Sequence, residues 1–270
     1  MATRPTILVI AASSDVGARL AAKRAAALAP DAELVVWGSS ELARLRWSHS
    51  VDPTGHTAST LALGTRRWTD GDLAAVWFLQ RTVLEAASVA TWSSPDRAYA
   101  EAEQEALWVS LLGSLGDRVV NAVDGSCPLG PSWSRLRWLA EARAVSLPIA
   151  PTEMSTSAPP HGEAVAAPRA LPGVVRRVHG TARIRAAVVG GRVFGTGDPE
   201  ARAGLSALAA KARCGALEVT LVLRTDGKLA LAAAEPLTRL NGAQEIEAAA
   251  RLLVQKARLH ITQVAEGRPS

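Results

Sequence analysis

Cysteine, lysine, tyrosine and phenylalanine are scarce in this sequence of 270 residues. The two cysteines, Cys127 and Cys214, lie far apart, which favours buried thiols in a reducing, cytoplasmic environment, and the CxxC spacing of metal ligands is absent. The five histidines also lack the spacing of metal ligands. No apolar run is long enough to cross a bilayer, so we expect no membrane segment. The N-terminal apolar run is followed at once by polar residues, which indicates a buried strand instead of a signal peptide.

The charge balance is basic, with 30 Lys and Arg against 25 Asp and Glu. Almost all of the basic residues are arginine, and the chain is also rich in alanine, a combination typical of high-GC coding sequences. The arginine clusters are short, whereas binding to a phosphate backbone requires charge gathered on one face, so we do not predict a nucleic-acid partner. A hydrophobic fraction of 48% is sufficient for a folded core built largely from small residues.

The N-terminal part has the pattern of a parallel α/β sheet. An apolar run at 6–13, a helical pattern at 16–30 and a second apolar run at 31–40 give the order strand, helix, strand. Residues 59–81 predict a strand, a turn in "TDGDL" and a further strand. Residues 95–115 predict a long amphipathic helix that begins near a proline and has acidic residues in its early turns.

The C-terminal part predicts two hairpins, each followed by a helix. The first hairpin turns over Gly190-Gly191 and the second over Asp226-Gly227, both of which suit tight turns. Between these hairpins and the N-terminal part, residues 155–173 are rich in proline, alanine and glycine. That composition is typical of a linker or mobile loop.

We therefore divide the chain into four segments. Residues 1–118 form an N-terminal βαβ domain, and residues 119–154 supply a short strand, a helix and an extended entry segment. Residues 155–173 form the linker or loop. Residues 174–270 form a C-terminal part of hairpins and helices.

The order of these pieces resembles the ATP-grasp ligases, and most closely the graspetide or microviridin-type maturases, which act on ribosomally made peptides. Five segments carry the resemblance in the correct order: "LAAVWFLQR", "YAEAEQEALWVSLLGSLGDRVVNAV", "SWSRLRWLAEARAVSLPIAPTEMS", "ARIRAAVVGGRVF" and "LRTDGKLALAAAEP". The resemblance implies an α/β, ATP-grasp-like fold. It has an N-terminal parallel-sheet (pre-ATP-grasp) domain and a C-terminal α+β half that would hold ATP and magnesium between two layers.

The sequence departs from this family where the nucleotide should bind. The resemblance implies lysines that contact the phosphates, but there is no lysine from Arg24 through Ala210. Arginine carries the same charge in a different ligand geometry. Only the stretch from Met154 to Pro172 lies where the family's middle layer belongs, and it has no strand pattern. We therefore expect a reduced C-terminal half that lacks most of the middle layer.

The metal ligands that the resemblance implies are also replaced. If Pro236 matches the family's proline, Ala233 stands at the glutamate position and Glu235 at the asparagine position. The upstream aspartate position falls near Leu221 or Thr220, and Glu218 is the nearest carboxylate. Magnesium requires oxygen ligands in a near-octahedral array. Glu218 and Glu235 either form a rearranged metal pair or are exposed strand-end residues, and we favour the second interpretation.

Arginine also occupies an acidic position on the first of the two hairpins. Arg185 matches the family's arginine, but Arg183 stands where the resemblance places an aspartate. Being two apart on a strand, both side chains face the same side. They either hold an anionic peptide or phosphate or are solvated. Trp77, on the Val-Trp strand, either faces a groove or, as we favour, packs in the core; Arg81 follows it.

From these observations we predict a catalytically silent ATP-grasp-like protein that is a partner or peptide-binding subunit in a bacterial biosynthetic pathway. We expect a peptide or protein partner, such as an active ligase encoded nearby, and an oligomer. Trp77, Arg81, Arg183 and Arg185 are the candidate peptide contacts, by strand addition and charge pairing. We assign no catalytic residue, cofactor or metal; Arg185, Glu218 and Glu235 are vestigial candidates.

Two alternatives remain open. The first is an active ATP- and Mg-dependent carboxylate-amine or ester ligase with a shortened lid, in which Glu218, Asp226 or Glu235 carries magnesium and arginines replace the lysines. The second is a new activity on the old scaffold without nucleotide. The sequence offers no nucleophile-base pair for it, although residues distant in sequence can meet in the fold.

Overall fold

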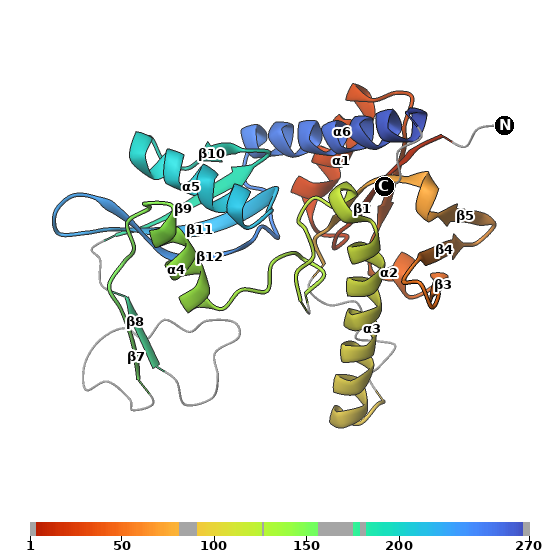
Figure 1. The fold of residues 1–270 in the computed structure, drawn as a ribbon, viewed down its shortest axis with the longest axis horizontal. Helices are drawn as coiled ribbons and strands as arrows, with labels where there is room; N and C mark the ends of the chain where they lie inside the picture. The colour runs from red at the N-terminus through yellow and green to blue at the C-terminus, as the bar shows by residue number, and fades with distance from the viewer. Residues whose placement is uncertain (1–3, 81–90, 126, 156–174, 179–181, 267–270) are drawn as a thin grey trace. The chain divides into compact units, whose positions relative to one another are not determined.

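The computed structural model describes residues 4–80, 91–125, 127–155, 175–178 and 182–266 (Figure 1). The chain divides into two compact units. Unit 1 comprises Met1–Ser132, Ala212–Ala216 and Pro236–Ser270, and unit 2 comprises Trp133–Lys211 and Leu217–Glu235. The last 35 residues therefore belong with the N-terminal unit, whereas the sequence-based division grouped 174–270 together. The sequence-based division follows the order of the chain, so it could not show that residues 236–270 pack with the N-terminal unit.

The parallel sheet of unit 1 has the strand order β2-β1-β6. It consists of β1 (Thr6–Ile10), β2 (Glu33–Trp37) and β6 (Leu73–Phe78), with β1 pairing in parallel to both neighbours. Helix α1 (Val16–Leu28) connects β1 to β2. Asp15 caps its N-terminus, where its side chain accepts a hydrogen bond from the backbone N–H of Ala18. The predicted parallel strand-helix-strand unit is confirmed.

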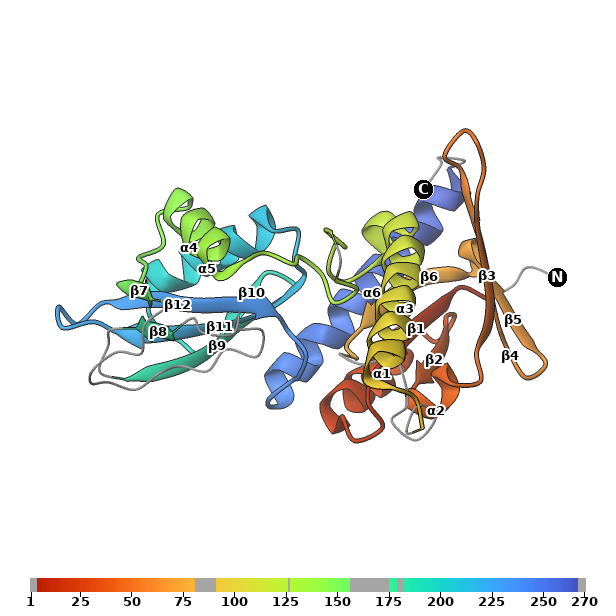
Figure 2. The same cartoon turned by 90° about the horizontal axis from the view of Figure 1, so that it is seen from below.

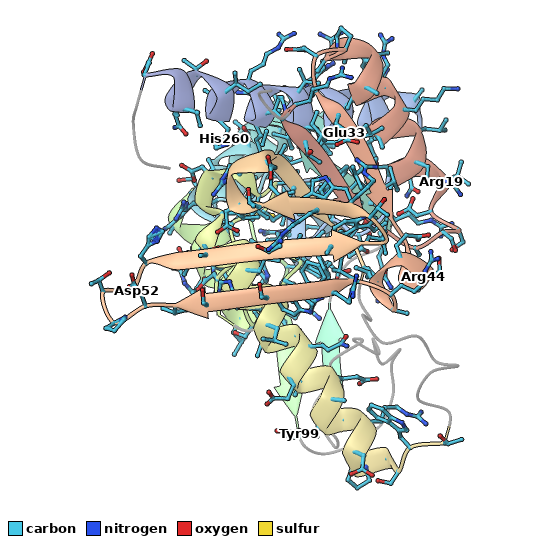
Figure 3. The ribbon with its side chains drawn as sticks, turned by 90° about the vertical axis from the view of Figure 1, so that its right-hand side faces the viewer. Arg19, Glu33, Arg44, Asp52, Tyr99 and His260 are labelled. Carbon is cyan, nitrogen blue, oxygen red and sulfur yellow. The ribbon has the colours of Figure 1, made fainter. Side chains whose placement is uncertain are left out.

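A second, antiparallel sheet lies between β2 and β6 in the chain. It has the order β3-β4-β5 and is built from β3 (Arg46–Val51), β4 (Thr57–Leu63) and β5 (Arg66–Thr69), preceded by the short α2 (Ser39–Leu42). Figure 3 shows these three strands side by side. The sequence analysis missed β3 and the turn between β4 and β5. The turn predicted in "TDGDL" is confirmed, as a 3₁₀ turn at Asp70–Asp72 that leads from β5 into β6.

Helices cover the parallel sheet of unit 1. Helix α3 (Ser94–Ser114) confirms the long helix predicted over 95–115, and its C-terminal half packs in a cluster with residues of β1, β2 and β6. Helix α6 (Ala243–Ala265) packs against α1, β1 and β6. No helix in the described residues has the length and apolarity needed to span a membrane.

Unit 2 contains a four-stranded sheet with the order β10-β9-β11-β12. Its strands are β9 (Arg183–Val189), β10 (Arg192–Phe194), β11 (Ala216–Leu223) and β12 (Leu229–Pro236). Both predicted hairpins are confirmed, and the glycines of the two turns adopt the positive φ angles that such turns require.

Helices α4 (Arg135–Ala144) and α5 (Pro199–Lys211) pack against each other on one face of this sheet (Figures 1 and 2). Gly204 lets α5 approach Leu147, which follows α4 in the chain, because a Cβ atom there would lie 2.9 Å from a methyl carbon of Leu147. Small side chains in this unit thus allow elements to pack closely, as the alanine-rich composition predicted.

A two-stranded antiparallel sheet flanks the part of the chain in which the sequence analysis expected most of the family's middle layer to be missing. It pairs β7 (Thr152–Ser155) with β8 (Val175–Val178). The sequence analysis found no strand pattern from Met154 to Pro172. Strand β7 ends inside that stretch, at Ser155, and β8 begins beyond it, at Val175. Apart from Ser155, the predicted linker 155–173 lies outside the described residues.

Candidate functional site

The arginine that matches the resemblance is paired with the nearest candidate carboxylate. Arg185 lies on β9 and Glu218 on the adjacent strand β11, and Nη2 of Arg185 is 3.1 Å from Oε2 of Glu218. Both side chains are 29% exposed, so the pair is shielded in part from water. Arg183, two residues earlier on β9, is exposed. The fold thus brings Arg185 and Glu218 together and satisfies the charge of each with the other.

The other acidic candidates do not join Glu218. Asp226 lies in the β11–β12 turn, where its Oδ2 is 3.0 Å from Nη2 of Arg224. Glu235 is exposed near the end of β12, at the far end of that strand from the turn. Among the described residues, no three His, Cys, Asp or Glu side chains gather as ligands for a metal. Magnesium requires several oxygen ligands, so these carboxylates do not fit it in this arrangement.

The tryptophan proposed as a groove residue lies in the core. Trp77 is 1% exposed near the C-terminal end of β6, and its buried indole nitrogen has no hydrogen-bond partner among the described residues. This burial agrees with the core interpretation that the sequence analysis favoured. Trp77 would contact a peptide only after local rearrangement. Arg81, the residue proposed beside it, lies outside the described residues.

Net charge is distributed unequally between the units. Unit 2 holds 13 of the 30 basic residues but only 8 of the 25 acidic ones, a net charge of +5. Unit 1 holds 17 of each and is formally neutral. The whole basic excess of the chain therefore belongs to the unit that contains Arg183 and Arg185, and this field favours an anionic partner.

The sequence analysis missed an open hollow beside the first turns of α3. The hollow has a volume of about 660 Å³, and Asp96, Tyr99 and Glu103 line it from one face of the helix. Their spacing of three and four residues was visible in the sequence and was a signal for a shared face. What the sequence did not show is that none of the described residues from 94 to 107 is buried, so this face is left exposed. The complete lining is Thr91, Trp92, Ser93, Asp96, Tyr99, Ala100, Glu103 and Gln104.

A histidine and two serines, distant in sequence, also meet in unit 1. His49 Nδ1 is 2.8 Å from Oγ of Ser59, and His49 Nε2 is 2.7 Å from Oγ of Ser110. The backbone N–H of Ser59 donates to a carboxylate oxygen of Asp70. Both ring nitrogens are used in joining β3 to β4 and α3, so we assign this network a structural role.

Comparisons with known proteins show which solved structures have a similar fold. No family model and no curated protein matches the chain. Among solved structures, the macrocyclase MdnC from Microcystis aeruginosa MRC, bound with precursor peptide MdnA, is similar with a TM-score of 0.72. The alignment covers 93% of this chain and 99% of that chain at 13% identity.

Two further solved structures have a similar fold. The macrocyclase MdnB from the same organism has a TM-score of 0.61 at 15% identity, with 92% of this chain and 99% of that chain covered. A Chryseobacterium gregarium RiPP-associated ATP-grasp ligase, in complex with ADP and a leader and core peptide, has a TM-score of 0.60 at 12% identity. That alignment covers 98% of both chains. The chain therefore has the ATP-grasp fold of the RiPP-associated macrocyclases and ligases, as the order of its sequence segments predicted.

Proposed function

We propose that the chain is a catalytically silent ATP-grasp-like subunit that binds a peptide or protein partner in a bacterial RiPP biosynthetic pathway. The observation that carries the proposal is the ion pair between Arg185 and Glu218 on β9 and β11. The carboxylate best placed to replace a lost metal ligand is already bound by a guanidinium. We assign no catalytic residue and no cofactor.

Electrostatics support the loss of the nucleotide site. A magnesium ion at Glu218 would have to displace Arg185, and the exposed positive charge of Arg183 lies on the same face of β9. The phosphates would also need cations from a chain that has no lysine between Arg24 and Ala210. Phosphoryl transfer depends on metal ions and positive side chains in fixed positions.

The charge of unit 2 supports an anionic peptide as the partner. Its net charge of +5 attracts such a chain, and Arg183 is exposed to meet it. The structure of MdnC contains a precursor peptide, and that of the Chryseobacterium gregarium ligase contains a leader and core peptide. In this chain we propose Arg183 and Arg185 as the contacts, with Arg81, and with Trp77 after rearrangement. An active ligase as a second partner and an oligomeric state are parts of the same proposal.

The alternative is an active ATP- and Mg-dependent ligase with a shortened lid. The structures of PsnB support it, since that ATP-grasp ligase is complexed with minimal precursor, Mg and ADP. In this chain the alternative requires Glu218 to leave Arg185, or Asp226 to leave Arg224, and to bind metal instead. Arginines would then have to replace both phosphate-binding lysines.

A thermal-shift titration with Mg-ATP distinguishes the two. A ligand at a hundred times its dissociation constant stabilises the folded state by about 2.7 kcal/mol, whereas the silent protein shows no shift at millimolar nucleotide. An upward shift that Glu218→Gln abolishes would favour the ligase alternative and would overturn the proposal that the nucleotide site is lost.

Peptide binding is tested separately, by fluorescence anisotropy of a labelled glutamate-rich decapeptide. We expect Arg183→Ala to weaken binding by about threefold or more, on the scale of one partly screened ion pair. Arg202→Ala is the matched control, because Arg202 is an exposed arginine of the same unit on α5. Equal losses in both variants would show attraction by net charge alone and would refute a site at β9.

A further inference from the structure

The N-terminal half of α3 lacks the packing that stabilises most helices. Its buried residues, Trp108, Leu111 and Leu112, all lie in the last turns, and none of residues 94–107 is buried. Tyr99 is 69% exposed and Leu107 is 42% exposed. Figure 3 shows Tyr99 near the end of α3 that points away from the sheets of this unit. Helices of this length are marginal in water without a packed face, so this half of α3 is suited to bind a partner.

The start of α3 is nevertheless locally ordered. Oγ of Ser93 accepts a hydrogen bond from the backbone N–H of Asp96 at 3.3 Å and donates one to Oδ2 of Asp96 at 2.6 Å. This cap fixes the carboxylate of Asp96 at the edge of the 660 Å³ hollow. About one helical turn further, Tyr99 adds a phenol ring to the same face. About one turn beyond Tyr99, Glu103 adds a second carboxylate.

The lining of the hollow combines aromatic and acidic side chains. Trp92, which is 44% exposed, and Tyr99 present aromatic rings, and Asp96 and Glu103 present carboxylates. Among the described residues, no basic side chain lines the hollow, and Arg97 of the same turn is not one of its lining residues. Rings attract cations through their faces, and carboxylates attract them through charge. The chemistry of the hollow is therefore selective for positive charge.

We propose that this hollow binds an arginine side chain of a peptide segment. A guanidinium suits it better than an ammonium because its plane stacks on a ring while its N–H groups meet a carboxylate in pairs. The lined face of α3, from Asp96 to Gln104, extends over about 12 Å, which is enough to hold the peptide backbone beside the inserted side chain. This site lies in unit 1 and is opposite in charge preference to the one proposed at β9.

The test uses the full chain and a fluorescein-labelled peptide in which alanines flank two arginines. Anisotropy should show binding, and the same peptide with citrulline in place of arginine should bind at least about tenfold more weakly. Tyr99→Ala should weaken binding about fivefold through loss of the ring face. Glu103→Gln should weaken it about threefold through loss of one carboxylate charge.

Glu101→Gln is the matched control. Glu101 is exposed on the same helix and carries the same charge, but it does not line the hollow. Its replacement should leave binding unchanged, and circular dichroism should show that all three variants keep their helix content. Equal effects of Glu101→Gln and Glu103→Gln, equal binding of the citrulline peptide, or no binding at millimolar peptide would each overturn the proposal. Binding of the glutamate-rich decapeptide reports on β9 alone and should not respond to these variants.

Discussion

The two units of this chain stabilise their folds with different side chains. Unit 1 fills the space around its parallel sheet with large aromatic residues, and Trp37, Phe78 and Trp108 belong to one buried cluster. Unit 2 has a sheet whose buried residues are mostly alanine, valine and leucine, as in the cluster of Ala150, Val222, Ala230 and Ala232. Its largest buried side chain is Trp138.

The two units also differ in their charge. Unit 1 is formally neutral overall but has an acidic, aromatic face on α3, whereas unit 2 has a net charge of +5. The comparison teaches that stability in unit 1 depends on a few large contacts. In unit 2 it depends on many small ones, and the net charge of +5 is the property on which we base the proposed anionic partner. The predictions below test the two kinds of packing.

The largest expected effect is that of Trp108→Ala. Trp108 is 3% exposed, and its ring centre lies 5.2 Å from that of Phe78 and 5.7 Å from that of Trp47. Removing a buried tryptophan leaves a cavity and typically costs about 3–5 kcal/mol of unfolding free energy. Urea denaturation followed by circular dichroism measures the loss.

Trp92→Ala is its control. Trp92 is 44% exposed, so its removal should change the unfolding free energy by less than about 0.5 kcal/mol. If the two substitutions cost the same, the stability of unit 1 does not depend on the buried aromatic cluster.

A smaller effect is expected of Gly204→Ala on α5. The new Cβ would lie 2.9 Å from Cδ1 and 3.0 Å from Cβ of Leu147, so the helix must move or Leu147 must rearrange. Such overpacking costs about 1–3 kcal/mol, which exceeds the gain of up to about 1 kcal/mol from alanine's helix propensity. We expect a net loss in the urea midpoint.

Gly113→Ala on α3 is the opposite case. A Cβ atom there meets nothing within 4 Å, so only the helix propensity changes and the protein should become more stable by about 0.5–1 kcal/mol. A gain at both positions would show that unit 2 is not closely packed between α4 and α5.

The smallest effect is a pH dependence within unit 1. His260 on α6 is 4% exposed, and burial lowers its pKa below the ordinary value of 6.5. The charge of Arg118 lowers this pKa further, while a weak hydrogen bond to the carbonyl of Gly71 opposes the shift. Asp70 also lies near this charge, because its carboxylate attracts Arg118.

The direction of the effect follows from the lowered pKa. The folded state keeps His260 neutral, so stability is complete above the unfolded value and declines as pH falls and the unfolded chain takes up a proton first. One proton limits the slope to about 1.4 kcal/mol per pH unit. His260→Gln should flatten the dependence of the urea midpoint between about pH 7 and about pH 5. An unchanged slope would assign the dependence to other groups.

The sequence predicted the elements with strong local signals. The strand-helix-strand unit, α3 and both hairpins of unit 2 follow from apolar periodicity and from glycines such as Gly190 and Gly227, which need no distant partner to fix their conformation. Strand β3 was missed because its alternation is weak and its pairing with β4 provides most of its stability.

The candidate site was predictable only in part. Arg183, Arg185 and Glu218 could be chosen from the sequence because the resemblance fixed their places in two hairpins. Their pairing could not, because it depends on the order in which β9 and β11 lie in the sheet. The hollow on α3 was missed for a similar reason, since a helical pattern shows which residues share a face but not whether that face is covered.

By itself, the sequence determined the order of the elements, the absence of lysine across the expected nucleotide site and the excess of arginine, because these are properties of the chain alone. Only the tertiary structure decided that Arg185 neutralises Glu218, that Trp77 is buried and that the last helix returns to the first unit. Ion pairs and burial depend on distances between residues far apart in the chain, and packing sets those distances.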